Sequence, residues 1–296
     1  MVEESGHNVT RTVYVECGSM YRREGPQDFR SIGETEFANG MAAMAASGRY
    51  GDCRIAAGIV GMANLRLGAE VVPILEAQIA AGNGRLRGLR FPTVYADTGL
   101  FGRAPDPSRK GILLEPTFRD GVRAMQCFGL SLDVWCLHPQ LDELADLADA
   151  CPEITIILDH VGTPLKLDAS LGRDAEVFPK WRSSIANLAR RPNVVAKLGG
   201  LGMDVIRPIG ATGGNTHSTQ LAADWRPYIE SCIEVFGASR CMFESNFPVD
   251  GATCSYGALW NAFKRIAAPC SEDEKTALFS GTATTVYRLD CVSAGL

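Results

Sequence analysis

The sequence predicts an α/β fold, a (β/α)8-type TIM barrel formed by a single domain over residues 1–296. Short apolar runs rich in β-branched residues alternate with longer stretches in which apolar residues recur every three or four positions. Nearly every apolar run ends on a polar residue followed by Gly or Pro, as expected where parallel strands end around a pocket. No linker, internal repeat or low-complexity tract divides the chain.

Seven segments are predicted to be strands because they are short, apolar and rich in β-branched residues. They are residues 9–17, 54–60, 86–91, 130–136, 155–159, 194–198 and 240–243. A closed barrel of this type has eight strands, and the residues before position 9 are too few for a further strand and helix. The first βα unit is therefore expected to be missing or displaced, unless the strand count is wrong.

Helices are predicted between the strands, where apolar residues are spaced three or four apart. The predicted helices cover residues 34–46, 68–81, 116–128, 140–150, 181–190, 225–236 and 256–266. A last helix is expected to begin at Ser271, because Glu274 follows three positions later as in a capping box. Two long irregular segments, 95–114 and 199–221, are expected to be lids or disordered loops.

Composition excludes several classes of protein. Hydrophobic residues make up 46% of the 296 residues and the net charge is −5, with no dense cluster of Lys or Arg. Nucleic acid and anionic membranes are therefore not expected as partners. The ten cysteines are scattered without a CxxC pair, which favours reduced core residues over a disulfide framework. The chain lacks an apolar signal segment or membrane span, so a cytoplasmic location is expected.

Two of the four histidines stand at predicted strand ends. His138 follows residues 130–136 and precedes Pro139, and His160 follows 155–159. Such a histidine suits a general base or a metal ligand; the alternative is a histidine that closes a turn by bonding to the backbone. Asp159 is expected to face the helices and bond a helix or loop amide rather than orient His160, because neighbouring strand residues point to opposite faces.

Four further side chains are predicted to contact a substrate. Lys197 lies in an apolar strand, where it is expected to act as a polar clamp; a Schiff base or a snorkelling side chain is the alternative. Glu16 also interrupts an apolar strand, so its carboxylate must be paired, protonated or bound to metal. Arg90 at a strand end, together with Tyr21, is expected to bind an anionic small molecule.

An ordered series of segments resembles the amidohydrolase-related family of TIM-barrel enzymes (amidohydrolase 2 type). That family includes sugar-lactone hydrolases, 2-pyrone-4,6-dicarboxylate lactonase and aminocarboxymuconate-type decarboxylases. The segments cover almost the whole chain and read GHNVTRTVYVECGSMYR, RIAAGIVG, LRGLRF, LDVWCLHPQL, TIILDHVGTP, PNVVAKLGGL and RCMFESNFPVD.

The resemblance also implies where a metal would bind. In metal-dependent members, a His-x-His pair, a histidine on the fifth strand and an aspartate on the eighth hold a divalent ion, usually zinc. By motif, His138 resembles the fifth-strand ligand, His160 resembles a sixth-strand catalytic histidine, and Asn246 takes the place of the aspartate. The chain has no His-x-His, and an amide is a poorer zinc ligand than a carboxylate. No cofactor is therefore expected, although the resemblance allows zinc with His138 as a ligand.

The resulting functional prediction is a hydrolase that opens a small lactone or cyclic ester without the family's usual metal site. His160 and His138 would transfer protons, and Asn246 would donate a hydrogen bond to the oxyanion. A decarboxylase or isomerase acting on a dicarboxylic ring-cleavage product is the first alternative. The second is a non-catalytic, degenerate barrel that completes its missing strand by association, for instance as a homo-oligomer.

Overall fold

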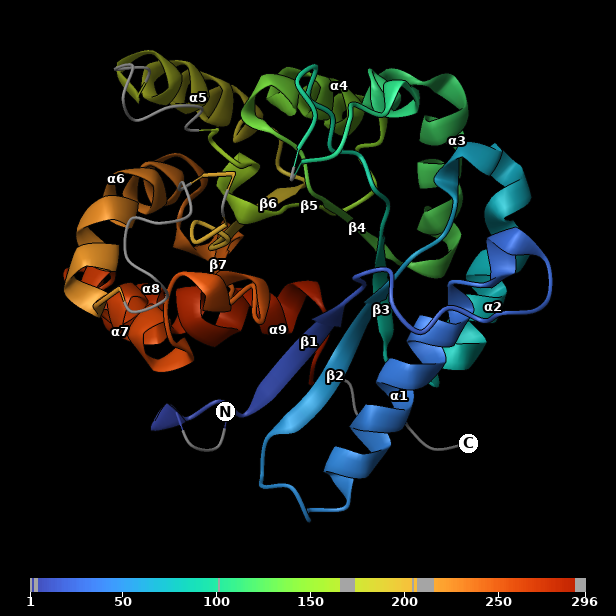
Figure 1. The fold of residues 1–296 in the computed structure, drawn as a ribbon, viewed down its shortest axis with the longest axis horizontal. Coiled ribbons are helices and arrows are strands. Elements are labelled where there is room, and N and C mark those ends of the chain that lie inside the picture. Colours follow the sequence, from blue (N-terminus) through green and yellow to red (C-terminus); the bar gives the residue numbers. More distant parts are fainter. Residues whose placement is uncertain are drawn as a thin grey trace.

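The seven predicted strands are all present and form one curled parallel sheet (Figure 1). The computed structural model describes residues 2, 5–100, 102–165, 174–203, 205–206 and 216–290. Neighbours in sequence are neighbours in the sheet, and every pair is parallel. The strands are β1 (Arg11–Val15), β2 (Arg54–Gly61), β3 (Leu86–Arg90), β4 (Ser131–Val134), β5 (Ile156–Leu158), β6 (Val194–Leu198) and β7 (Cys241–Phe243).

The sheet does not close into a full barrel. Among the described residues no strand pairs β7 with β1, so the eight-stranded prediction is only partly right and the fold is a barrel-like half with one unit fewer. The outward helices keep the expected alternation with the strands. They are α1 (Ile32–Ala46), α2 (Val72–Gly82), α3 (Pro116–Ala124), α4 (Leu141–Ala150), α5 (Asp174–Leu188), α6 (Ser218–Phe236) and α7 (Tyr256–Ile266).

Two further short helices follow α7: α8 (Glu272–Thr276) and α9 (Thr282–Val286). The capping box predicted for α8 is confirmed: the Glu274 amide donates to Ser271 Oγ, and the Ser271 amide donates to Glu274 Oε2 at 2.8 Å. The predicted helix 68–81 begins later than expected. Gly68, with a φ of 60°, kinks the short helical segment Leu65–Val71, and α2 starts after it at Val72.

The C-terminal segment fills the open side of the sheet. In Figure 1, α9 lies between β7 and β1. Tyr287, which follows α9, is buried with Val60, Ile157 and Met242 in a small interior cluster, and Val13 of β1 packs against the same cluster. Apolar side chains of α9 thus cover the strand interior where an eighth strand would otherwise stand.

The structure also bears on the predictions for membrane spans, cysteines and the two long irregular segments. None of their helices is long and apolar enough to cross a membrane. None of the nine described cysteines forms a disulfide, but Cys17 and Cys127 are exposed, so the prediction of core cysteines is wrong for these two. The segment 95–114 forms two short turns, Pro107–Arg109 and Ile112–Leu114. Of the second predicted lid, residues 204 and 207–215 lie outside the described residues.

Because all seven strands are parallel, their carboxyl ends meet at one edge of the sheet. Glu16, Phe91, Asp159, Gly199 and Glu244 each follow directly after a strand at this edge. The polar residues singled out at strand ends are therefore brought to one side of the molecule.

Candidate active site

A histidine–carboxylate pair joins the ends of β5 and β7. His160 Nδ1 lies 2.6 Å from Glu244 Oε1, and the same oxygen accepts the backbone N–H of His160 at 3.0 Å. Both side chains are largely buried. Burial alone would lower the pKa of His160, but the Glu244 carboxylate raises it above its ordinary value. The carboxylate also fixes the ring orientation, which leaves Nε2 available for proton transfer.

Two glycines at the end of β6 make room for this pair. Gly199 and Gly200 follow the strand that lies between β5 and β7. A Cβ at Gly199 would overlap with Glu244, and a Cβ at Gly200 would overlap with the His160 ring. Gly200 also has a left-handed φ of 67°, which disfavours any side chain. His160 and Val161 themselves have φ values of 55° and 49°, a strained turn of the kind found at functional sites.

A second charged cluster lies deeper in the sheet interior. Arg90 pairs with Glu16 Oε1 at 2.8 Å and with Asp159 Oδ2 at 3.1 Å. Lys197 pairs with Asp133 Oδ2 at 2.6 Å and with Asp159 Oδ1 at 2.8 Å. Burial would raise the pKa of Asp159, but the Lys197 and Arg90 cations hold it well below its usual range. Burial would lower the pKa of Lys197, and its two aspartates raise it instead.

The contacts in this cluster contradict one prediction for Asp159 and identify the partners of Glu16, Arg90 and Lys197. The prediction that Asp159 bonds a helix or loop amide is wrong, because its partners are Arg90 and Lys197. The prediction that Asp159 does not hold the His160 ring agrees with Glu244 filling that role. Glu16 is paired, which was one of its three alternatives. Arg90 and Lys197 stand at the predicted edge but have carboxylates of the protein as partners.

Asn246 is held beside the pair by a buried aspartate. Its Nδ2 donates to Asp250 Oδ1 at 2.8 Å, and the Gly202 amide donates to Asp250 Oδ2 at 3.2 Å. Burial raises the pKa of Asp250 to about 7. An amide nitrogen carries two hydrogens, so Asn246 retains a second N–H. Its backbone φ of 49° places it in a turn directly after β7.

His138 contacts the turn that follows His160. Its Nδ1 accepts the Leu165 amide at 3.2 Å, and its own backbone amide donates to the Thr163 carbonyl at 3.3 Å. Nδ1 is therefore unprotonated and Nε2 carries the hydrogen. Burial lowers the pKa of His138, which keeps the ring neutral. The turn-closing role and a donor role for Nε2 are compatible in this geometry.

The described residues do not fit the family's mononuclear metal site. No group of three His, Cys, Asp or Glu side chains among them could hold a metal ion. His160 Nδ1 is occupied by Glu244, and the Asn246 amide is turned to Asp250. His138 Nδ1 is occupied as an acceptor.

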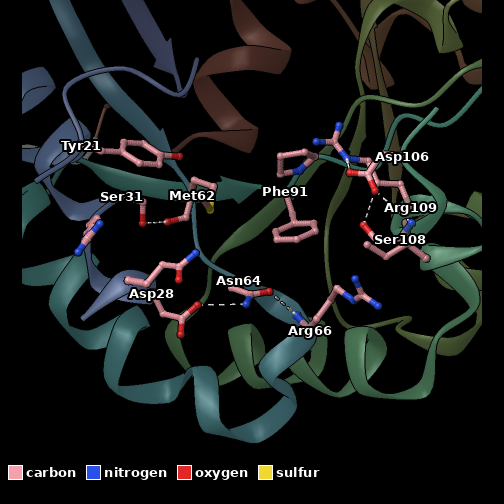
Figure 2. Close-up of a pocket in the computed structure, with 14 residues that line it drawn as sticks. Tyr21, Asp28, Ser31, Met62, Asn64, Arg66, Phe91, Asp106, Ser108 and Arg109 are labelled. Atoms are coloured by element: carbon pink, nitrogen blue, oxygen red, sulfur yellow. Dashed lines mark hydrogen bonds and ion pairs between the residues drawn. The ribbon is translucent and has the colours of Figure 1, made fainter. Parts of the chain in front are cut away.

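A pocket of about 850 Å³ opens at the same edge, beside the ends of β1, β2 and β3 (Figure 2). Tyr21 lines it, and so does Phe91, directly after Arg90. That Tyr21 contacts a substrate stays a prediction. His138, His160 and Asn246 are not among its lining residues. The sequence thus predicted one site where the structure has a pocket and a separate histidine pair.

Sequence reasoning missed Glu244, the partner of His160. Its position was readable, because it is the first residue after the β7 strand and an unusual carboxylate there. The pairing was not readable, because His160 and Glu244 are 84 positions apart. Asp133 was also missed, although a carboxylate within the apolar run Ser131–Val134 demands a buried partner.

Comparison with known proteins finds similar sequences and a similar fold. A family model described as amidohydrolase matches residues 12–289. The uncharacterized protein y4mH of Sinorhizobium fredii is 33% identical over 98% of this chain and 84% of its own length. An L-fucono-1,5-lactonase of Burkholderia multivorans is 31% identical over 80% of this chain and 73% of its own. A solved zinc-bound amidohydrolase from the same species has a TM-score of 0.67 at 25% identity, covering 86% of this chain and 78% of its own.

Proposed function

Because this chain belongs to the amidohydrolase family and is an enzyme of hydrolase type, we propose that it hydrolyses a small lactone with His160 as the general base. One observation supports this most: His160 Nδ1 is held by Glu244 at 2.6 Å, so the ring is oriented and its basicity increased. A curated relative named L-fucono-1,5-lactonase supports the reaction class.

Each step can be assigned to an atom of the chain. His160 Nε2 takes a proton from water, and the resulting hydroxide attacks the lactone carbonyl. Glu244 stabilises the imidazolium that forms. Collapse of the tetrahedral intermediate breaks the ring C–O bond, and His160 returns its proton to the leaving alkoxide. The product is one hydroxy acid, so water is the only co-reactant.

Two further groups are proposed to stabilise the oxyanion. One N–H of the Asn246 amide is donated to Asp250, and the second is proposed to bond to the oxyanion. Asn246 lies two residues after Glu244. His138, neutral with its hydrogen on Nε2, is a second donor at the same edge. Asp250 would position Asn246 rather than contact the substrate. No step of this mechanism passes through a metal ion.

Replacing His160 by Asn tests the proposal. Removing a general base should lower kcat for lactone hydrolysis by roughly 10²–10⁴-fold while KM changes little. A panel of 1,5- and 1,4-lactones, followed by proton release, measures this. His217→Asn is the matched control, because His217 is exposed at the start of α6. Undiminished hydrolysis by His160→Asn would remove the assignment, and carbon dioxide among the products would favour a decarboxylase instead.

A further inference from the structure

The pocket beside β1–β3 is lined by both hydrogen-bond donors and hydrogen-bond acceptors. Asp28 and Asn64 line it from one side, and Asp106, Ser108 and Arg109 from the other, with Phe91 between them (Figure 2). Asn64 Nδ2 donates to Asp28 Oδ1 at 3.1 Å, and Ser108 Oγ donates to Asp106 Oδ1 at 2.6 Å. An aromatic ring surrounded by planar polar side chains suits a flat ligand with polar edges.

Three arginines and two aspartates line this pocket, and most of these charged groups already have partners within the protein. Arg66 donates from Nε and Nη2 to both oxygens of Glu115, at 3.0 and 3.1 Å. Arg109 donates from Nε to Asp106 at 3.0 Å. The third arginine, Arg30, donates to the Gly25 carbonyl. Asp28 and Asp106 are the two carboxylates of the lining, and Glu115, the partner of Arg66, lies outside it.

A carboxylate ligand could use only the donors of this pocket and would meet Asp28 and Asp106 as like charges. A hydroxyl group both donates and accepts, so it can bond to an aspartate and an arginine at once. The chemistry therefore favours a neutral ligand that carries several hydroxyls. This differs from the anionic substrate that the sequence predicted from Arg90 and Tyr21.

The pocket is also separate from the histidine pair. Phe91 follows β3 and His160 follows β5, with β4 between them. Adjacent strands are about 4.8 Å apart, so the two sites lie roughly 10 Å apart. One six-membered ring is too short to occupy both positions.

We propose that this pocket is a second subsite that binds a neutral, hydroxyl-bearing ring attached to the lactone, so that the substrate is a two-ring lactone. The proposal rests on the proposed lactone hydrolysis at His160. Phe91 would stack on the attached ring, while Asp28 and Arg109 bond to its hydroxyls. Asp28 and Arg109 lie in short helical turns outside the charged cluster of the sheet interior, so they are able to set specificity without altering the base.

The test compares cellobiono-1,5-lactone with glucono-1,5-lactone, which lacks the second ring. The wild-type kcat/KM should be at least roughly tenfold higher for the two-ring lactone. Asp28→Ala and Arg109→Ala should each remove most of that difference and leave hydrolysis of the one-ring lactone unchanged. Arg103→Ala, an exposed change in the same loop outside the pocket, is the matched control.

Equal kcat/KM for the two lactones in the wild type would overturn the proposal, as would equal losses on both in the pocket variants. Faster hydrolysis of a carboxylated one-ring lactone, glucaro-1,4-lactone, would also overturn it. These results are independent of His160→Asn, which tests hydrolysis itself. If the wild type hydrolyses no lactone, binding of unreactive cellobiitol decides: binding that Arg109→Ala abolishes supports the subsite, and no binding overturns it.

Discussion

Two charged clusters share one edge of the sheet but differ in how many carboxylate partners each cationic group has. In the interior cluster, Lys197 has two aspartate partners and Arg90 has a glutamate and an aspartate. In the other cluster, His160 has one carboxylate on one ring nitrogen. The cation of Lys197 mainly neutralises the two carboxylates that it contacts. An imidazole that is hydrogen-bonded through Nδ1 can still exchange a proton at Nε2.

The number of partners distinguishes residues with a structural role from residues with a catalytic role, although both kinds have similar positions in the sequence. Lys197 lies near the end of β6 and His160 follows β5, and both were predicted to act on the substrate. Their partners indicate that the interior cluster holds the strands together, while the His160–Glu244 pair carries the reaction. Four variants would break or sharpen this distinction.

The largest effect is expected from Lys197→Met. The change leaves Asp133 and Asp159 buried with less compensation, and removing one member of a buried ion pair typically costs about 3–5 kcal/mol of the free energy of unfolding. Chemical denaturation measures this. Lys110→Met, which breaks an exposed ion pair with Asp97, is the control and should leave the unfolding midpoint unchanged.

A stable Lys197→Met variant that has lost activity would contradict the structural role. It would restore Lys197 as the substrate clamp that the sequence predicted.

The next effect is expected from Gly200→Ala. The added methyl group would displace the His160 ring and separate it from Glu244, so kcat should fall by about several hundredfold, close to the loss in His160→Asn. Gly129→Ala is a matched control, because Gly129 has a left-handed φ of 61° but no atom within 4 Å of an added Cβ. Both variants share the cost of a left-handed alanine, and only Gly200→Ala should lose activity.

Glu244→Gln should change both the rate and its pH dependence. His160 acts as a base only when neutral, and its pKa is raised above the ordinary 6.5. The wild-type kcat/KM should therefore rise with pH through an inflection above 6.5 and then level off. Replacing the carboxylate removes what raises this pKa, so the inflection should move to lower pH, while the plateau falls by about a hundredfold. An unmoved inflection would show that another group controls the rate.

Much of the fold could be predicted from the sequence, because strands buried on both faces read as apolar runs and parallel strands need long helical connections. The positions of the strand ends could be predicted for the same reason, since nearly every apolar run stops at a polar residue. The packing of α9 into the open side of the sheet could not be predicted, because α9 is only Thr282–Val286 and its sequence shows no helical period. Burial of Tyr287 against four strands depends on contacts distant in sequence.

The error on Asp159 has a local cause. Strand alternation applies only while the backbone stays extended, and β5 ends at Leu158. His160 and Val161 then adopt left-handed φ values, so the chain turns within two residues. Asp159 is still extended, with φ −75° and ψ 145°, so it faces the sheet interior with Ile157, where Arg90 and Lys197 lie. The turn after it brings the His160 ring to Glu244 instead of to the opposite face. Such a turn has no clear sequence signal, because glycine is absent from both positions.

The smallest effect is expected from Tyr287→Phe, which tests how the C-terminal segment is joined to the interior cluster. The Tyr287 hydroxyl donates to Asp133 Oδ2 at 2.7 Å, beside the Lys197 ammonium. Losing a hydrogen bond to a charged group should cost about 2 kcal/mol of the free energy of unfolding. Tyr95→Phe removes an equivalent bond to Asp97 at the surface and is the control, with no measurable change expected. Lactone hydrolysis should be unchanged in both, since neither tyrosine contacts His160 or Glu244 in the described structure. A loss of activity without a loss of stability in Tyr287→Phe would instead mean that the interior cluster takes part in the reaction, and the separation between the two clusters would fail.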